Sequence, residues 1–245
     1  MRANILFVFE GTREANFFSK IQNHIKGLDD IVHFVFDAEI YQLFRLLNAD
    51  PDLDVFNLLK ERSLKFNAEL ESFKRDDFAQ IYFFFDYDGH ASKADDSNIK
   101  DMLDLFNEET ENGRLFISYP MLEAFHHIQE TDDSFRDLNV KCKVNIGYKQ
   151  VVNDECKKGL INDCGKKPEA MKFVLESHLK KANFLLVNEY VLPEVILDQK
   201  DIFIKQLTTH IQPNSEVAVL SCLPLFLQQY FGVDQFNISL QSLEV

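Results

Sequence analysis

The segment IYFFFDYDGH, residues 81–90, constrains the fold more than any other part of the sequence. Five consecutive aromatic or branched residues precede Asp86, and such an unbroken apolar run is typical of a strand buried on both faces of a sheet. A second run, ILFVF at residues 5–9, ends at Glu10 and Gly11, where glycine permits a tight turn. Both runs therefore predict core strands that end in acidic residues.

Helical patterns alternate with the predicted strands. Apolar residues spaced by three or four predict a helix that begins at about residue 13 and stops at Gly27. Further segments follow the same alternation, with strands at 31–36 and 114–119 and helices at 41–48, 97–109 and from residue 121. This order predicts an α/β fold with a mostly parallel sheet flanked by helices.

The chain divides into two regions by its patterns. Residues 1–130 hold the strand–helix alternation and form the predicted core, with a charged helical insertion at about 50–78 that Pro51 separates from the preceding helix. From residue 131 the strand signal fades, and helices are predicted at 168–182, 194–211 and 223–231. Residues 131–245 are therefore predicted to be a mainly helical C-terminal extension.

Composition excludes several classes of protein. The chain is 46% hydrophobic with only 8 Gly and 6 Pro, which excludes disordered and fibrous chains. It has neither an apolar run of membrane-spanning length nor a leader pattern at its start, so no membrane association is expected. The four cysteines match neither a zinc pattern nor a disulfide framework. These features predict a cytoplasmic protein.

The charge is acidic overall but unevenly distributed. A net charge of −14 opposes diffuse binding to nucleic acid. Residues 141–181, however, hold ten lysines against five acidic residues. The stretch is either a solvated face between helices or a phosphate-binding surface beside a carboxylate-rich site.

Acidic residues follow three of the predicted strands. Glu10 and Glu14 follow the first, Asp86 and Asp88 end the strand at 81–86, and Glu123 follows Pro120. Sites in open parallel sheets form at the carboxyl ends of strands, and the i, i+2 spacing of the two aspartates places both on one face of a strand. Clustered carboxylates suit Mg²⁺ or Mn²⁺, and two such ions can clamp a phosphodiester. Taken singly, Glu10 and Glu14 also fit ordinary partners of a helix N-terminus.

These segments resemble a known family. FVFEGTREANFF at residues 7–18, followed by IYFFFDYDGH, resembles the TOPRIM nuclease core of the OLD and RloB-like families. Glu10 matches the glutamate that ends the first strand, Glu14 the second glutamate, and Asp86 and Asp88 the Asp-x-Asp motif. SYPMLEAF at residues 118–125 is similar to the RloB-like motif in which Asn-Pro and a glutamate precede an apolar helix, with Tyr119 in place of the asparagine.

The resemblance covers residues 4–127 and implies a TOPRIM/Rossmann-like fold with a metal-dependent nuclease activity. It implies DNA or RNA as substrate, Mg²⁺ or Mn²⁺ as cofactor, and Glu10, Glu14, Asp86 and Asp88 as metal ligands, with Glu123 as a further ligand or water-orienting group. It also implies an ATPase partner in a bacterial anti-phage system. The sequence contains no P-loop, so any ATP dependence is expected to come from another chain. Homo-oligomerisation stays open.

Other basic groups are candidates for the site. Lys149, which follows Gly147 and Tyr148 in the lysine-rich stretch, is our candidate for the catalytic lysine of such nucleases. His90 follows the aspartates and is either a metal or phosphate contact or a simple loop residue. His126 and His127 are adjacent, so they face different directions if that segment is helical.

Two other functions compete with a nuclease. FFFDYDG also resembles the haloacid-dehalogenase phosphatase motif, in which Asp86 would attack phosphorus and Asp88 would act as general acid. That motif normally lies on an early strand, and it would leave the three glutamates unused. The other alternative is a non-catalytic docking or regulatory domain, to which the 24 phenylalanines and the acidic charge would also be suited.

Overall fold

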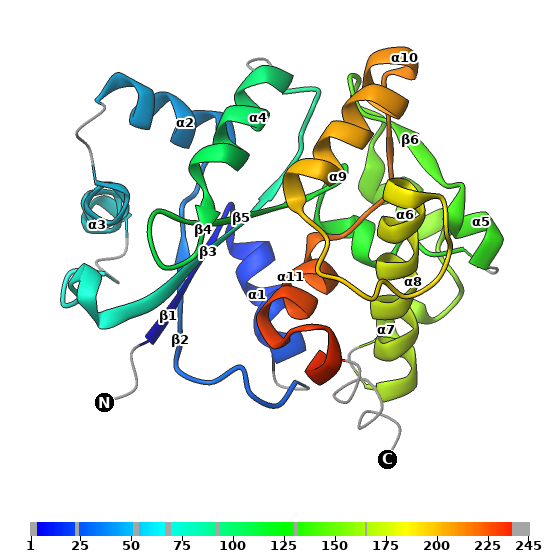
Figure 1. Ribbon diagram of the computed structural model, residues 1–245, viewed down its shortest axis with the longest axis horizontal. Helices are drawn as coiled ribbons and strands as arrows, with labels where there is room; N and C mark the ends of the chain where they lie inside the picture. The colour runs from blue at the N-terminus through cyan, green and yellow to red at the C-terminus, as the bar shows by residue number, and fades with distance from the viewer. Residues whose placement is uncertain are drawn as a thin grey trace. The chain divides into compact units, whose positions relative to one another are not determined.

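The two dominant apolar runs are neighbouring strands of one sheet (Figure 1). The five strands, in the order β2-β1-β3-β5-β4, are Ile31–Val35, Asn4–Phe9, Phe78–Asp86, Gly113–Ser118 and Asn107–Glu108. Strand β1 runs parallel to both β2 and β3, whereas the short edge strand β4 is antiparallel to β5. The predicted α/β fold with a mostly parallel sheet is therefore confirmed.

The computed structural model describes residues 4–22, 25–50, 54–66, 70–91, 94–129, 132–164 and 166–236. Pro51, which was expected to end a helix, lies outside these residues. Within them, no helix is both long enough and apolar enough to cross a membrane.

Phenylalanine rings fill both faces of the sheet. On one face, Phe18 of helix α1 contacts Phe7, Phe9 and Phe84 at centroid distances of 5.0, 5.5 and 5.2 Å. On the other face, Phe83 contacts Phe106 at 4.6 Å. Successive residues of a strand point to opposite faces, so an unbroken apolar run is what this two-sided burial requires.

The helices around the sheet agree with most of the predicted ranges. They are α1 (Thr12–Gln22), α2 (Ile40–Ala49), α3 (Val55–Phe66), the 3₁₀ turn η1 (Arg75–Asp77) and α4 (Asp96–Leu105). Helices α2 and α4 contact each other, and α1 packs on β1 and β2 (Figure 1). Helix α1 is described from Thr12 to Gln22, and residues 25–27, which end at Gly27, form a turn.

The C-terminal half is mainly helical but also holds a second sheet. Its elements are η2 (Leu122–His126), α5 (Asp132–Arg136), β6 (Asn139–Lys141), α6 (Tyr148–Glu155), α7 (Leu160–Asp163), α8 (Pro168–Val187), α9 (Gln199–Lys205), the π-helical turn η3 (Gln206–Ile211), α10 (Gln212–Asn214), β7 (Glu216–Ala218) and α11 (Cys222–Phe231). Strands β6 and β7 pair in antiparallel fashion and were not predicted, because strands of three residues are too short to show a period.

Two predicted helices differ from the structure in this half. The helix expected from residue 121 is the 3₁₀ turn η2, and the helix expected from residue 194 begins only at Gln199, after the cap residue Asp198. Asp198 accepts hydrogen bonds from the amides of Lys200 and Asp201, which fixes the start of α9.

The chain forms two compact units, neither of which is continuous in sequence. The first consists of Met1–Phe85 and Asp95–Phe116, and the second of Asp86–Ala94 and Ile117–Val245. The boundary that the sequence suggested at residue 130 falls inside the second unit. Strands β3 and β5 both begin in the first unit and end in the second.

Candidate functional site

The two aspartates lie where β3 ends and a turn begins. Asp86 is the last residue of β3 and is only 8% exposed, whereas Asp88 lies beyond the strand with φ of +43°. Strand alternation therefore does not extend to Asp88, and the expected i, i+2 placement on one strand face is wrong. Asp88 tolerates the left-handed conformation that the turn requires. Main-chain hydrogen bonds to Ser118 and Pro120 hold this segment in place.

Tyr87, between the aspartates, anchors the turn. Its side chain is fully buried, and the Nζ atom of Lys143 donates a hydrogen bond of 2.8 Å to its hydroxyl. A Cβ atom at Gly89 would lie 2.4 Å from the Tyr87 ring and 3.1 Å from the carbonyl oxygen of Cys142. The close approach of this ring explains why the residue after Asp88 is glycine.

A cavity of about 470 Å³ in the second unit collects several of the predicted site residues. Its lining includes Asp88, His90 and Lys149. Nδ1 of His90 lies 3.8 Å from Oδ1 of Asp88, and Nζ of Lys149 lies 3.9 Å from Oε1 of Glu123. Lys141 also lines the cavity, but its Nζ pairs with Oε1 of Glu216 at 3.0 Å and donates to the carbonyl of Asn214. The cavity therefore offers both signs of charge to a ligand.

Glu10 and Glu14 belong to the first unit, at the carboxyl end of β1. The amide of Glu10 donates to the carbonyl of Phe84 at 3.2 Å, which continues the pairing of β1 with β3. Glu14 lies in the first turn of α1, and its carboxylate folds over Gly11, where an added Cβ would meet Oε2 at 2.8 Å. The Glu14 carboxylate therefore returns toward the turn that follows β1.

The carboxylate oxygens of the acidic residues at these strand ends are the kind of ligand that a hard divalent cation prefers. No group of three or more His, Cys, Asp or Glu side chains in the described part of the chain is arranged to hold a metal ion. Mg²⁺, however, is commonly held by one or two carboxylates, with water and substrate phosphate completing its shell. Asp86, nearly buried, and Asp88, which lines the cavity, are the pair that suits this mode of binding.

A hydrogen-bonded chain beside the cavity was missed from the sequence. Nδ1 of His127 lies 2.9 Å from the hydroxyl of Tyr148, and Nε2 lies 3.2 Å from Oε2 of Glu155. His127 is fully buried, Tyr148 lines the cavity, and the Glu155 side chain is 48% exposed. The i, i+7 spacing of Tyr148 and Glu155 indicates that both can lie on one face of a helix. His127 lies 21 and 28 residues away from them, so the sequence pattern does not connect it with either residue.

The pKa values of Tyr148 and His127, two of these hydrogen-bonded residues, shift in opposite directions. Burial raises the pKa of Tyr148 well above its ordinary value, and the carboxylates of Glu123, Glu155 and Asp86 raise it further. Burial lowers the pKa of His127, the hydrogen bond and charge of Glu155 raise it, and Lys181 lowers it. A neutral tyrosine and a neutral histidine are therefore favoured at neutral pH.

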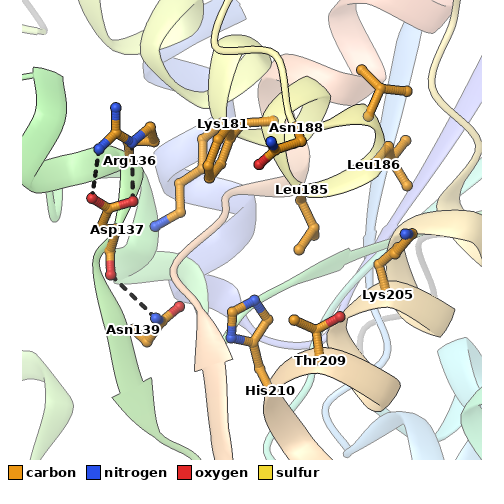
Figure 2. Close-up of a pocket in the computed structure, with 12 residues that line it drawn as sticks. Arg136, Asp137, Asn139, Lys181, Leu185, Leu186, Asn188, Lys205, Thr209 and His210 are labelled. Carbon is orange, nitrogen blue, oxygen red and sulfur yellow. Dashed lines mark hydrogen bonds and ion pairs between the residues drawn. The ribbon is translucent and has the colours of Figure 1, made fainter.

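A second cavity, of about 500 Å³, lies elsewhere in the second unit (Figure 2). Figure 2 shows the Lys181 side chain reaching toward the paired Arg136 and Asp137, with His210 and Thr209 also lining the cavity. Nζ of Lys181 donates to two main-chain carbonyls near the end of α5. Burial lowers the pKa of Lys181 well below its ordinary value, while Asp137 raises it. Its two bonds indicate a structural role.

The lysine-rich stretch is not one continuous basic face. Lys141 and Lys149 line the first cavity and Lys143 bonds to Tyr87, but Lys181 is buried and Lys167 pairs with Asp163 at 2.9 Å. Lys141 also pairs with Glu216, at 3.0 Å, so these lysines do not share one arrangement.

Comparisons with known proteins add no relative. No protein-family model, curated protein or solved structure matches this chain.

Proposed function

We propose that the chain is a divalent-metal-dependent nuclease that hydrolyses phosphodiester bonds in DNA or RNA. The observation that carries this proposal is the cavity in which Asp88 and His90 lie together with Lys141 and Lys149. Carboxylates can hold a metal ion, and a lysine such as Lys149 can bind the phosphate and balance charge on the leaving oxygen. Carboxylates alone would repel a polyanionic substrate, and the net charge of −14 would add to that repulsion.

In this proposal Asp86 and Asp88 supply metal ligands, and Glu123 orients water or completes the ligand set. Glu10 and Glu14, which the family resemblance also implies as ligands, belong to the first unit. A bound Mg²⁺ or Mn²⁺ ion would supply Lewis-acid activation of the phosphoryl group. Lys149 would stabilise charge on the leaving oxygen. On the strength of the family resemblance alone, we further propose that the protein works as an effector beside an ATPase partner in anti-phage defence.

The test is a calorimetric titration of Mn²⁺ into the wild-type chain and the double variant Asp86→Asn/Asp88→Asn, with cleavage assays on plasmid DNA and tRNA. We expect the variant to lose Mn²⁺ binding and to cleave at least about 100-fold more slowly, because even outer-shell partners of a metal cost 10–100-fold. Asp201→Asn, which changes an exposed carboxylate on α9 in the same unit, is the matched control.

The other outcomes separate the alternatives. A wild-type chain that binds no Mn²⁺ and cleaves neither polymer would contradict the proposal and favour a docking domain. Hydrolysis of a small phosphate monoester without cleavage of either polymer would favour the phosphatase. Equal cleavage by the wild type and the double variant would exclude the two aspartates from the reaction.

A further inference from the structure

The hydrogen-bonded chain of Tyr148, His127 and Glu155 has a direction that its chemistry fixes. An ionised carboxylate only accepts hydrogen bonds, so Nε2 of His127 carries the proton that is donated to Glu155. In a neutral ring Nδ1 is then an acceptor, and the Tyr148 hydroxyl donates to it. The tyrosine proton is therefore directed toward the histidine, and the lone pairs of the tyrosine oxygen stay available to other donors.

Tyr148 and Glu155, the two ends of this hydrogen-bonded series, lie in different surroundings. Tyr148 lines the cavity that also holds Asp88 and Lys149, and it is 6% exposed. Glu155, at the other end of α6, is about half exposed. His127, between them, has no exposed surface and has both ring nitrogens engaged. The three side chains thus link the cavity with solvent through a path that excludes water at its centre.

We propose that these three residues form a proton-transfer chain for the hydrolysis, with Tyr148 accepting a proton from the attacking water. As the water oxygen bonds to phosphorus and the bond to the leaving oxygen breaks, one water proton moves to the Tyr148 oxygen. The Tyr148 proton moves to Nδ1 of His127, and the proton on Nε2 passes to Glu155 and from there to solvent. Tyr148 would touch the reacting water, whereas His127 and Glu155 are positioning residues. This inference rests on the proposed nuclease function.

The electrostatic surroundings suit an exchange in which the tyrosine stays neutral. The carboxylates around Tyr148, from Asp86, Glu123 and Glu155, oppose a phenolate, so a proton must arrive as another leaves. Glu155 favours a positive charge on His127 and Lys181 opposes it. Such an activated hydroxyl, held by a base that a carboxylate orients, has the same logic as a catalytic triad.

The hydrogen-bond direction can be tested without any reaction, by ¹⁵N NMR of the histidine rings. In the wild type we expect His127 at neutral pH to carry its proton on Nε2. In Glu155→Gln the preference for Nε2 should weaken, because the amide can either accept from that nitrogen or donate to it. Asp154→Asn, which removes the neighbouring exposed charge on α6, should leave the tautomer unchanged. A wild-type ring protonated on Nδ1 would overturn the proposal, whatever the activity.

The catalytic role is tested by the pH dependence of cleavage with Mn²⁺. Tyr148→Phe should lower kcat by about 100-fold with little change in KM, since proton transfer by a positioned group contributes 10²–10⁴-fold. In Glu155→Gln the pKa of His127 should fall, because Glu155 raises it, so the acidic limb of the rate profile should move to lower pH. Asp154→Asn should retain the wild-type limb. If the three hydrogen-bonded side chains had only a structural role, Glu155→Gln would change the stability of the protein and leave the acidic limb of the rate profile in place.

The outcomes distinguish this inference from the function on which it rests. The expected tautomer in a wild type that cleaves nothing would refute the nuclease function and with it the proton-transfer role. An active wild type in which Tyr148→Phe keeps its kcat, or in which Glu155→Gln keeps its acidic limb, would overturn the proton-transfer chain alone.

Discussion

At the scale of single residues, packing around Tyr87 determines what can follow Asp88. An added Cβ at Gly89 would overlap the Tyr87 ring at 2.4 Å, and that ring is fully buried with its hydroxyl bonded to Lys143. At Gly11 an added Cβ meets the carboxylate of Glu14, the far end of a flexible side chain. Gly11 should therefore tolerate a substitution by alanine better than Gly89 does.

Gly89→Ala should destabilise the protein by about 1–3 kcal/mol, the usual cost of overpacking a filled site. Gly11→Ala should cost less, because the Glu14 carboxylate can swing away. Urea unfolding of both variants and the wild type measures the difference. Equal midpoints for Gly89→Ala and the wild type would show that the Tyr87 ring is free to shift.

The sequence predicted candidate site residues that stand out from their neighbours along the chain, but it did not predict contacts between residues that are far apart in sequence. Asp86 and Asp88 stood out because they follow an apolar run directly, and Lys149 was chosen among ten lysines and lies 3.9 Å from Glu123. The roles of these residues stay predictions. The partners of Lys143 and His127 could not be predicted, because Tyr87 and Tyr148 are distant from them in sequence and only the fold brings them together.

At the scale of elements, long apolar strands were predicted well and helix starts less well. Strand β3 was evident because burial on both faces demands an unbroken apolar run. Helix α9 began five residues later than expected, at Gln199 rather than residue 194. Its start depends on the side chain of Asp198, whereas apolar residues at 195–197 extended the helical pattern beyond the true start.

Asp198→Ala should therefore lower the free energy of unfolding by about 1 kcal/mol, the typical loss when an N-cap is removed. The side chain accepts from the amides of Lys200 and Asp201 at 2.8 and 3.1 Å, and alanine would leave both without that acceptor. Asp198→Asn should retain most of the stability. Chemical denaturation tests this, with Glu194→Ala in the preceding exposed loop as the control. Equal losses for the two alanine variants would argue against a capping role.

At the scale of the whole molecule, buried histidines make the fold sensitive to acid. Burial lowers the pKa of His178 to about 3 and that of His126 to about 4. Nδ1 of His178 accepts a hydrogen bond from the Ser221 amide, so a proton on that nitrogen would face another donor. Below the ordinary histidine pKa of 6.5, the unfolded chain binds protons that the folded chain does not.

Stability should accordingly fall as the pH decreases from about 6.5 toward 4, by up to about 1.4 kcal/mol per pH unit for each such histidine. Urea unfolding at several pH values measures the slope. His178→Gln should flatten it by about that amount, whatever its effect on stability at pH 7. His90→Gln, which removes an exposed imidazole, is the matched control. An unchanged slope in His178→Gln would show that His178 is protonated in the folded state.

The division into two discontinuous units affects how the units can be exchanged between genes and the order in which the cavity is assembled during translation. The chain passes between the units three times, at residues 85–86, 94–95 and 116–117. A single recombination event therefore cannot transfer either unit intact to another gene, and no single cut yields one of them as a fragment. During translation the segment with Asp86 and Asp88 emerges before Pro120, Lys143 and Tyr148, so the cavity is assembled only after most of the chain has been made.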